Sequence, residues 1–351
     1  MTVHLHGLGT ALPPHVLPQD VVQSRATEIL GPRYPQFERL TSTFASAGIE
    51  RRHSVVPLDW FSADHGWAER NAAYLAGGTA LFIEAARRAL DAAGWRADEV
   101  DCIVTVSSTG IATPTLEARA MAEMGFRRDV ARVPVFGLGC AGGVCGLSLA
   151  QSLAQANPGA RVLLVVVETC TLWFRTDRLQ KADIIATVLF GDGAAAACVS
   201  GRAPGARRVT LEPGTQVTWP DTLGIMGWEV DDAGLGVVFD RAIPDFVDDH
   251  LAQAAEEALT ACGMTRGEVD RFVCHPGGAK VITAIERALH LDQGVLGAER
   301  EVLRDAGNMS APTVLFVLDR VLASGTSGRM MATALGPGFT GAFLPLTAQA
   351  A

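Results

Sequence analysis

Ala89-Leu-Asp-Ala-Ala-Gly-Trp-Arg-Ala-Asp-Glu-Val-Asp101 and Ala258-Leu-Thr-Ala-Cys-Gly-Met-Thr-Arg-Gly-Glu-Val-Asp270 are two versions of one stretch of sequence, identical at seven of thirteen positions. In each stretch the pattern predicts that an amphipathic helix ends at a glycine, Gly94 or Gly263, and is followed by a polar turn and a strand. The two stretches lie 169 residues apart. That period is too long for a solenoid, so we infer that the chain contains two copies of one domain.

The repeat continues further along the chain. Gly139-Cys140 in the first half and Gly307-Asn308 in the second each lie in a glycine-bearing turn that opens a helix, and they are 168 residues apart. Both halves finish with a Gly-x-Gly turn before a strand of small residues, at Gly191 in one and at Gly336 in the other. Cys140 and Asn308 therefore occupy equivalent places in the two predicted domains.

Alternating apolar runs and helical patterns predict an α/β fold. The apolar run at residues 162–167 follows a helical pattern at 147–156, and another helical pattern covers 281–289. This order is typical of sheets that helices cover on both faces. The least hydrophobic stretch, residues 200–208, is the natural junction, so we place the two domains at residues 1–203 and 204–351.

Composition excludes several classes of function. The chain has 351 residues, of which 48% are hydrophobic and 19% charged, so a large core and about two domains are expected. Lys and Arg number 29 against 38 Asp and Glu, without a basic cluster. Neither a nucleic acid nor an anionic membrane surface is therefore an expected partner. The longest aliphatic run is also far shorter than the roughly 20 residues that span a bilayer.

The cysteines and the start of the chain indicate a reducing compartment. There are seven cysteines and no Cys-x-x-Cys pair, so reduced thiols are expected rather than disulfides. The first residues lack the charged-then-apolar pattern of a secretion signal, so we expect a cytoplasmic location. His4 and His6 could share one strand face, but no third ligand lies nearby in sequence, and no metal site is predicted.

Three polar side chains lie at predicted strand ends, where ligands bind in α/β sheets. Cys140 follows the apolar run at residues 133–136, His275 follows the run at 272–274, and Asn308 precedes a helical pattern. If the two halves pack about a pseudo-twofold axis, Cys140 and Asn308 face each other. His275 can then complete a Cys/His/Asn set.

A cysteine, a histidine and an asparagine together suit carbon–carbon bond formation between thioesters. A thiolate at a helix N-terminus beside an imidazolium is expected to have a lowered pKa, so Cys140 could carry an acyl group. A second thioester with a β-carboxylate could lose CO₂ if its carbonyl oxygen met His275 Nε2–H and the Asn308 amide. The resulting enolate would attack the acyl group. Because CO₂ loss drives the reaction, no metal or organic cofactor is expected.

Four motifs carry a family resemblance. The segments Gly139-Cys-Ala-Gly-Gly143, Cys274-His-Pro-Gly-Gly278, Gly307-Asn-Met-Ser310 and Gly336-Pro-Gly-Phe339 resemble signatures of type III polyketide synthases, the chalcone synthase family. The resemblance spans nearly the whole chain and implies a thiolase-like αβαβα five-layer fold and a homodimer. It implies iterative decarboxylative condensation of malonyl-CoA onto an acyl-CoA starter. Cys140 would be the acyl-carrying nucleophile, and His275 and Asn308 would promote decarboxylation.

The same resemblance implies substrate-binding roles for further residues. Phe190 is similar to the family's gatekeeping phenylalanine, and Val237 stands where plant members have a second one. Arg39 matches a basic position that grips CoA phosphates. Because Ser42 and Ser46 replace other members of that basic cluster, an acyl carrier protein is an alternative acyl donor. The residues expected to shape the cavity are Ser310, Cys170, Trp173, Gly336, Pro337 and Gly338.

Product and reaction class leave alternatives open. The segments Met226-Gly-Trp-Glu-Val230 and Pro57-Leu-Asp-Trp60 resemble bacterial members, many of which make alkylpyrones or alkylresorcinols from fatty acyl starters. This is the predicted product class. One alternative is a condensing enzyme like ketoacyl-acyl-carrier-protein synthase III, although such enzymes carry Asn where this chain has Gly278. Another is a non-catalytic paralogue. Residues 137–142 also match a dinucleotide fingerprint, but a cysteine would occupy its phosphate-facing turn.

Overall fold

The computed structural model describes residues 2–34, 36–178, 180–203 and 209–350. Within these ranges the strands are β1 (Val3–Ala11), β2 (His15–Pro18), β3 (Arg51–Ser54), β4 (Cys102–Val106), β5 (Ala131–Val135), β6 (Arg161–Thr169), β7 (Asp192–Ser200), β8 (Val209–Leu211), β9 (Thr215–Thr218), β10 (Met226–Asp231), β11 (Gly234–Phe239), β12 (Arg271–Cys274), β13 (Gly328–Gly336) and β14 (Thr340–Ala348). The α-helices are α1 (Gln19–Leu30), α2 (Phe37–Leu40), α3 (Ser42–Ser46), α4 (Trp67–Ala93), α5 (Leu116–Met124), α6 (Gly142–Ala156), α7 (Lys181–Leu189), α8 (Ile243–Ala261), α9 (Ala279–Ala288), α10 (Gly297–Ala306) and α11 (Thr313–Ala323).

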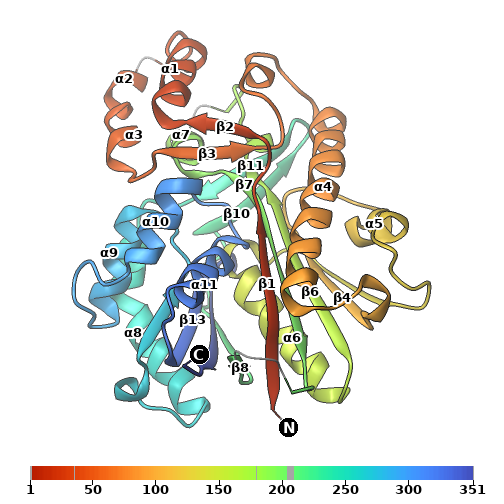
Figure 1. The fold of residues 1–351 in the computed structure, drawn as a ribbon. Helices are drawn as coiled ribbons and strands as arrows, with labels where there is room; N and C mark the ends of the chain where they lie inside the picture. Colours follow the sequence, from red (N-terminus) through yellow and green to blue (C-terminus); the bar gives the residue numbers. More distant parts are fainter. Residues whose placement is uncertain (1, 35, 179, 204–208, 351) are drawn as a thin grey trace.

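Ten strands form one mixed sheet that runs through the molecule (Figure 1). Their order is β12-β13-β14-β8-β1-β7-β6-β4-β5, and β9 pairs with β14. One arm of the sheet consists of β1 and β4 to β7, and the other consists of β8, β9 and β12 to β14. The arms join at β8, which pairs antiparallel with both β1 and β14.

Strand β6 shows why the first arm is buried on both faces. Residues 163, 165 and 167 belong to the apolar cluster that contains α4, and residues 162, 164 and 166 belong to the cluster that contains α6 and α11. Successive side chains of a strand point to opposite faces, so this unbroken apolar run packs against helices on both sides. The doubly covered sheet predicted from the run is confirmed.

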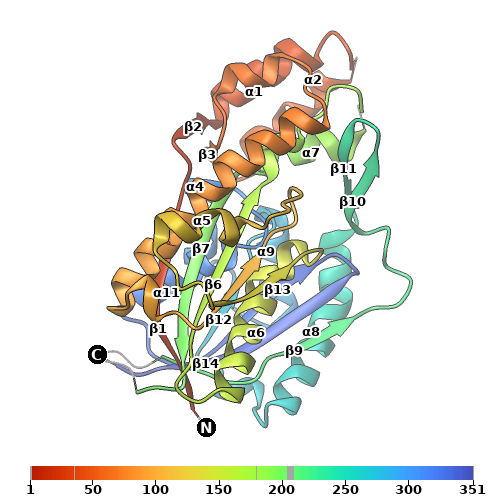
Figure 2. The ribbon, with the colours of Figure 1, turned by 90° about the vertical axis from the view of Figure 1, so that its right-hand side faces the viewer.

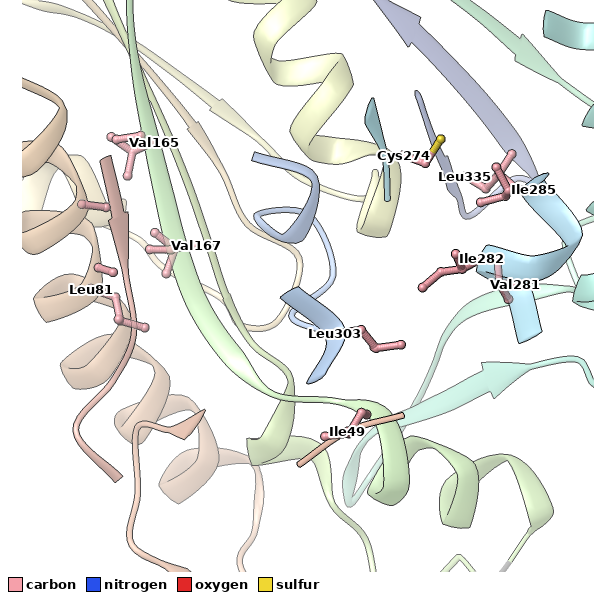
Figure 3. Close-up of a cluster of buried hydrophobic side chains, with 14 of the residues drawn as sticks. Ile49, Leu81, Val165, Val167, Cys274, Val281, Ile282, Ile285, Leu303 and Leu335 are labelled. Atoms are coloured by element: carbon pink, nitrogen blue, oxygen red, sulfur yellow. The ribbon is translucent and has the colours of Figure 1, made fainter. Parts of the chain in front are cut away.

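The elements form five layers. Helices α6 and α11 lie in the middle, and their apolar residues share one cluster with strands of both arms. Helix α4 covers the outer face of the first arm, and α8 and α9 cover the outer face of the second, as Figure 2 shows. In Figure 3, Val281, Ile282 and Ile285 of α9 lie beside Leu335 of β13 and Cys274 of β12. The predicted thiolase-like αβαβα fold is confirmed.

The two repeated stretches of sequence have the same structure. Helix α4 ends at Gly94, where φ is 64°, and α8 is followed by Gly263, where φ is 66°. Glycine adopts this left-handed conformation without a steric penalty, so both predicted helix ends are confirmed. A 3₁₀ turn then leads into β4 or β12. The proposed boundary between 1–203 and 204–351 adjoins residues 204–208, which lie outside the described residues, and it stays a prediction.

Segments outside the repeat cover one end of the sheet. Helices α1 to α3, the pair β2–β3 and the hairpin β10–β11 gather at the upper end of the molecule in Figure 2. Of these segments, α1, β2, β3 and the hairpin β10–β11 supply walls of the two cavities described below. Within the described ranges, each helix is too short or too polar to cross a membrane.

Candidate active site

Cys140 lies in the turn between β5 and α6. It belongs to a short 3₁₀ segment, Gly139–Ala141, directly before α6 begins. Gly139 has a φ of 46°, which favours glycine at this point of the turn. Cys140 is only 5% exposed, and its thiol donates a hydrogen bond to Ser310 Oγ at 3.5 Å. The sulfur therefore lies inside the protein at the N-terminal end of α6.

The loop Gly336-Pro337-Gly338 packs directly against this turn. A Cβ atom on Gly336 would lie 2.7 Å from Ala141 N, and one on Gly139 would lie 2.6 Å from Pro337 Cδ. Such distances are shorter than van der Waals contact, so both positions require glycine. The sequence predicts a cavity-shaping role for these residues, and the structure places them in support of the Cys140 turn.

Asn308 lies in the equivalent turn before α11 and is held by four hydrogen bonds. Its backbone N–H donates to Leu189 O at 2.9 Å, and its carbonyl accepts from Gly191 N–H at 3.0 Å. Its side-chain Oδ1 accepts from Ser310 N–H at 2.8 Å, and its Nδ2 donates to Gly277 O at 3.1 Å. These two side-chain bonds fix the orientation of the amide, and its second N–H lies on the side of the Cys140 sulfur, whose pKa the Asn308 side chain acts to lower.

His275 directly follows β12, and its backbone N–H donates to Thr333 O at 2.9 Å. The residue is 5% exposed. Within the described part of the chain, neither ring nitrogen of His275 has a hydrogen-bond partner. Buried polar atoms without a partner are rare in proteins, so this imidazole is available to a ligand.

Cys140, His275 and Asn308 line one cavity of about 440 Å³, which we call the chamber. The structure thus brings Cys140 and Asn308 together, as the pseudo-twofold argument predicted, and places His275 beside them. The catalytic roles of the three residues stay predictions. The remaining lining is apolar apart from the threonine and one glycine: Met226, Phe239, Ile243, Leu251, Gly277, Val281, Ile285, Thr333, Ala334 and Leu335. Val281, Ile285 and Leu335 are labelled in Figure 3.

Burial in the chamber leaves both ionisable groups uncharged. It raises the pKa of the Cys140 thiol to about 11, and the charge of Glu168 also acts to raise this pKa. Burial lowers the pKa of the His275 imidazole to about 4. In the free protein, burial therefore acts against the predicted thiolate–imidazolium pair.

A larger open cleft, of about 700 Å³, lies next to the chamber. Three of the predicted pocket residues, Cys170, Trp173 and Phe190, line it. Most of its other walls are apolar and come from the N-terminal segments, from α7 and from the β10–β11 hairpin: Leu17, Val22, Ala26, Ile29, Leu58, Phe61, Phe174, Ala186, Trp228 and Val237. The cleft is thus a mainly apolar space with a few polar groups in its wall.

The hairpin β10–β11 separates the two cavities. Met226 pairs with Phe239 and both line the chamber, whereas Trp228 pairs with Val237 and both line the cleft. The ring of Phe190 meets the ring of Phe239 edge to face, with centroids 6.3 Å apart. Val237 was the predicted position of a second gate residue, but the partner of Phe190 at the boundary is Phe239. Strand periodicity puts residues 237 and 239 on one face, and the register of the hairpin decides which of them reaches Phe190.

Two further predicted residues differ in their placement. Ser310 lies between Cys140 and Asn308 and bonds to both, with an unusual positive φ of 60°. Arg39 is exposed on α2 and lines neither cavity, so its predicted contact with CoA phosphates stays a prediction. Among the described residues, no group of three His, Cys, Asp or Glu side chains is arranged to hold a metal ion.

Sequence reasoning missed two buried charged residues near the site. Glu168 is fully buried and accepts hydrogen bonds from Ser108 N–H at 2.9 Å and Thr109 Oγ1–H at 2.7 Å. Burial raises the pKa of its carboxyl to about 8. Arg52 is 3% exposed and lines the cleft. The position of Glu168 directly after the apolar run 162–167 could have indicated its burial. No such pattern distinguishes Arg52, because the neighbouring Arg51 is an arginine as well.

Comparisons with known proteins place both halves in one family. Residues 65–204 match the N-terminal domain of chalcone and stilbene synthases, and residues 210–346 match the C-terminal domain. The chain is 39% identical over 350 residues to a 1,3,6,8-tetrahydroxynaphthalene synthase of Streptomyces peucetius subsp. caesius, covering 96% of this chain and 91% of the relative. It is 32% identical over 271 residues to type III polyketide synthase A of Arabidopsis thaliana, covering 74% and 69%.

Solved structures agree with this result. The crystal structure of 1,3,6,8-tetrahydroxynaphthalene synthase from Streptomyces coelicolor A3(2), a bacterial type III polyketide synthase, superposes with a TM-score of 0.93. The sequence identity is 28%, and the alignment covers 99% of this chain and 100% of the other. The chain therefore belongs to the chalcone and stilbene synthase family, as a bacterial type III polyketide synthase of the acyltransferase class.

Proposed function

We propose that Cys140 carries the acyl chain and that His275 and Asn308 generate the enolate that extends it. The observation that supports this is the chamber, where a thiol, an imidazole with two unpartnered nitrogens and an oriented carboxamide share one apolar cavity. Hydrogen-bond donors placed where negative charge develops give the largest rate gains in acyl chemistry. The apolar walls make those donors stronger because they exclude water.

Loading begins from two uncharged groups. The Cys140 sulfur attacks the carbonyl carbon of the acyl-CoA, and its proton passes to the neutral His275 imidazole. The bond between the acyl carbon and the CoA sulfur then breaks, and CoA leaves with that proton. Because burial holds the pKa of His275 low and that of Cys140 high, charges separate only while a thioester is bound.

Extension uses the same imidazole with the carboxamide. The thioester oxygen of malonyl-CoA accepts hydrogen bonds from His275 and from the second N–H of Asn308 Nδ2. The bond to the carboxylate breaks, CO₂ leaves, and the electron pair forms an enolate. The enolate carbon attacks the acyl carbonyl on Cys140, and the Cys140 sulfur leaves as a thiolate that takes up a proton from solvent. The chain, longer by one keto unit, is now bound to CoA. Reloading onto Cys140 repeats the cycle.

For the starter we propose an apolar acyl group, with an alkylpyrone, an alkylresorcinol or a related aromatic polyketide as product. The apolar walls of the cleft support this choice, because they can bury an alkyl chain. The second candidate is synthesis of a polyhydroxynaphthalene from malonyl units alone. The 39% identity to a 1,3,6,8-tetrahydroxynaphthalene synthase favours it.

Product analysis separates these readings. The enzyme is incubated with malonyl-CoA alone and with malonyl-CoA plus acetyl-, octanoyl- or palmitoyl-CoA, and the products and the intact protein are analysed by mass spectrometry. Pyrones or resorcinols that contain the starter support the first candidate, and a tetrahydroxynaphthalene from malonyl-CoA alone supports the second. In a parallel incubation with malonyl-acyl carrier protein, a single ketoacyl product on the carrier would indicate a ketoacyl synthase III-like enzyme. Absence of acylated Cys140 would indicate a non-catalytic paralogue.

We also propose a homodimer. Phe136 and Ile111 are 64% and 60% exposed, and Phe136 directly follows β5, the edge strand of the first arm. Large exposed apolar side chains next to a sheet edge are typical of an interface. Sedimentation of the wild type and of Phe136→Asp tests this, and a monomeric wild type would contradict it.

We propose that the reaction needs no metal or organic cofactor and takes place in the cytoplasm. The chemistry written above uses only the two thioesters and the three side chains. Full product formation after exhaustive dialysis against EDTA is expected, and loss of activity that Zn²⁺ or Mg²⁺ restores would refute it. Replacing acyl-CoA by an acyl carrier protein in the same assay decides which of the two delivers the starter.

A further inference from the structure

Arg52 lies in the wall of the cleft with its stem packed against two glycines. A Cβ on Gly307 would lie 2.7 Å from Arg52 Cγ, and one on Gly191 would lie 3.4 Å from Arg52 Cβ. Gly307 precedes Asn308, and Gly191 follows Phe190. The guanidinium is therefore buried at the junction of the cleft with the residues that border the chamber.

One nitrogen of this guanidinium is anchored and two are not. Nη1 donates to Thr187 O at 2.6 Å and to Phe190 O at 2.8 Å, at the C-terminal end of α7. In the part of the chain that the structure describes, Nε and Nη2 are buried and have no hydrogen-bond partner. The free edge of the guanidinium is thus the one that carries Nε and Nη2.

Arg52 also lacks an ion-pair partner within 4.0 Å among the described residues, unlike the other arginines of the cleft. Arg25 pairs with Asp59 at 3.1 Å, and Arg175 pairs with Asp231 at 2.7 Å. The charge of Asp192 raises the pKa of Arg52, but burial dominates and lowers it to about 10. A buried cation without a close counter-charge is costly, and the missing partner indicates a ligand.

The geometry of the free edge identifies the kind of ligand. Nε–H and Nη2–H of an arginine point in parallel and fit a pair of oxygens about as far apart as those of a carboxylate. A 1,3-dioxo unit in its enol or enolate form also presents two oxygens on one side. Arg52 lines the cleft and is absent from the chamber wall, so the malonyl carboxylate, which must lie near Cys140, is the wrong partner.

We propose that Arg52 binds a 1,3-dioxo unit of the growing chain as the chain enters the cleft past Phe190. This inference rests on the proposed function, because decarboxylative extension produces a keto group on every second carbon. The contact holds the extended chain in the cleft between rounds, so Arg52 determines how many extensions occur before release. It acts after loading and after the first decarboxylation.

A binding experiment tests this without turnover. Nonane-2,4-dione and nonan-2-one, which differ by one carbonyl, are titrated into wild type, Arg52→Lys and Arg266→Lys, and tryptophan fluorescence is followed because Trp173 and Trp228 line the cleft. Lysine keeps the positive charge and can donate to the α7 carbonyls, but it lacks the parallel pair of N–H donors. Arg266 is the matched control, since it donates to Leu289 O at the end of α9 and lines neither cavity.

In the wild type and in Arg266→Lys, the diketone is expected to bind at least about tenfold more tightly than the monoketone, as two charge-assisted hydrogen bonds would produce. Arg52→Lys should lose this preference and keep its affinity for the monoketone. Equal binding of the two probes to the wild type, or an unchanged preference in Arg52→Lys, would overturn the inference. Because no chain extension is needed, this outcome is independent of whether Cys140 carries an acyl group.

Product length gives a second readout. Arg52→Lys is expected to shift its products towards fewer extensions at a given amount of acylated Cys140, which is measured in the same samples. Arg266→Lys should give the wild-type distribution. If Arg52→Lys lost loading and extension equally, Arg52 would have a structural role only. If the distribution of product lengths were unchanged, Arg52 would have no role in determining chain length.

Discussion

The two equivalent turns of the repeat hold their polar side chains in opposite ways. Asn308 is bound through its backbone N–H, its carbonyl, its Oδ1 and its Nδ2. The Cys140 thiol is held less tightly, by a long hydrogen bond to Ser310 Oγ at 3.5 Å and by an interaction with the Asn308 side chain. The turn that contains Cys140 is positioned instead by close packing against Gly336 and Pro337. One duplicated scaffold thus holds a carboxamide through hydrogen bonds in one half and a thiol mainly through packing of its turn in the other.

In the proposed reaction, Cys140 carries the acyl chain and Asn308 helps to form the enolate. Cys140→Ala is the strongest test of this division. We expect complete loss of acyl loading and of polyketide product, measured by intact-protein mass and product analysis. Slow malonyl-CoA decarboxylation should continue because both donors remain. Cys145→Ala, at a buried cysteine one turn further along α6, should load normally. Polyketide formation by Cys140→Ala would remove this residue from the mechanism.

Removing one of the two proposed hydrogen-bond donors should slow decarboxylation. Asn308→Ala and His275→Ala are each expected to lower malonyl-CoA decarboxylation by about 10² or more, the usual loss for one oxyanion donor. Asn308→Ala should still accept an acyl group on Cys140, whereas His275→Ala should also load slowly because it lacks the proton acceptor. CO₂ release is followed directly, with Asn157→Ala at the exposed end of α6 as control. Undiminished CO₂ release would contradict the donor roles.

The arrangement of the fold could be predicted because it depends on local patterns. The glycine-ended helices at Gly94 and Gly263 mark the repeat, and the unbroken apolar run 162–167 requires cover on both faces. The pairing of Cys140 with Asn308 followed from their equivalent places in the two halves. These inferences need only periodicity and chain order, which the sequence carries in full.

Properties that depend on several segments at once could not be predicted. The charge states of Cys140 and His275 depend on how completely distant apolar side chains exclude water, and the chamber reverses the expected directions. Phe239 replaced Val237 as partner of Phe190 because the register of a hairpin decides which residue reaches the boundary. The burial of Arg52 depends on its contacts with the C-terminal end of α7, and the residues beside Arg52 in sequence do not predict those contacts.

Packing at the Cys140 turn can be disturbed without touching the sulfur. Gly336→Ala would place a methyl group 2.7 Å from Ala141 N, so the two turns must separate. Overpacking of this kind costs ~1–3 kcal/mol, and a misplaced nucleophile should load acyl groups about tenfold more slowly or worse. Loading rate and thermal unfolding are both measured. Gly267→Ala, whose methyl group would meet open space, is the control, and normal loading by Gly336→Ala would show that the contact does not position Cys140.

The smallest expected effect concerns the charge beside the free thiol. With a pKa of about 11 for Cys140, alkylation by iodoacetamide should rise about tenfold per pH unit between pH 7 and 10, because the thiolate fraction does. Burial is the main cause, so Glu168→Gln removes only the smaller contribution of the carboxylate charge. It should lower the pKa of Cys140 and speed alkylation at pH 9, where Glu168 is ionised, by less than the roughly tenfold change that one pKa unit would give. Peptide mapping assigns the label to Cys140, and the exposed substitution Glu301→Gln should leave the curve in place. A plateau near neutral pH would mean that the turn at Cys140 stabilises a thiolate after all, and that the contrast between a hydrogen-bonded carboxamide and an uncharged thiol does not hold.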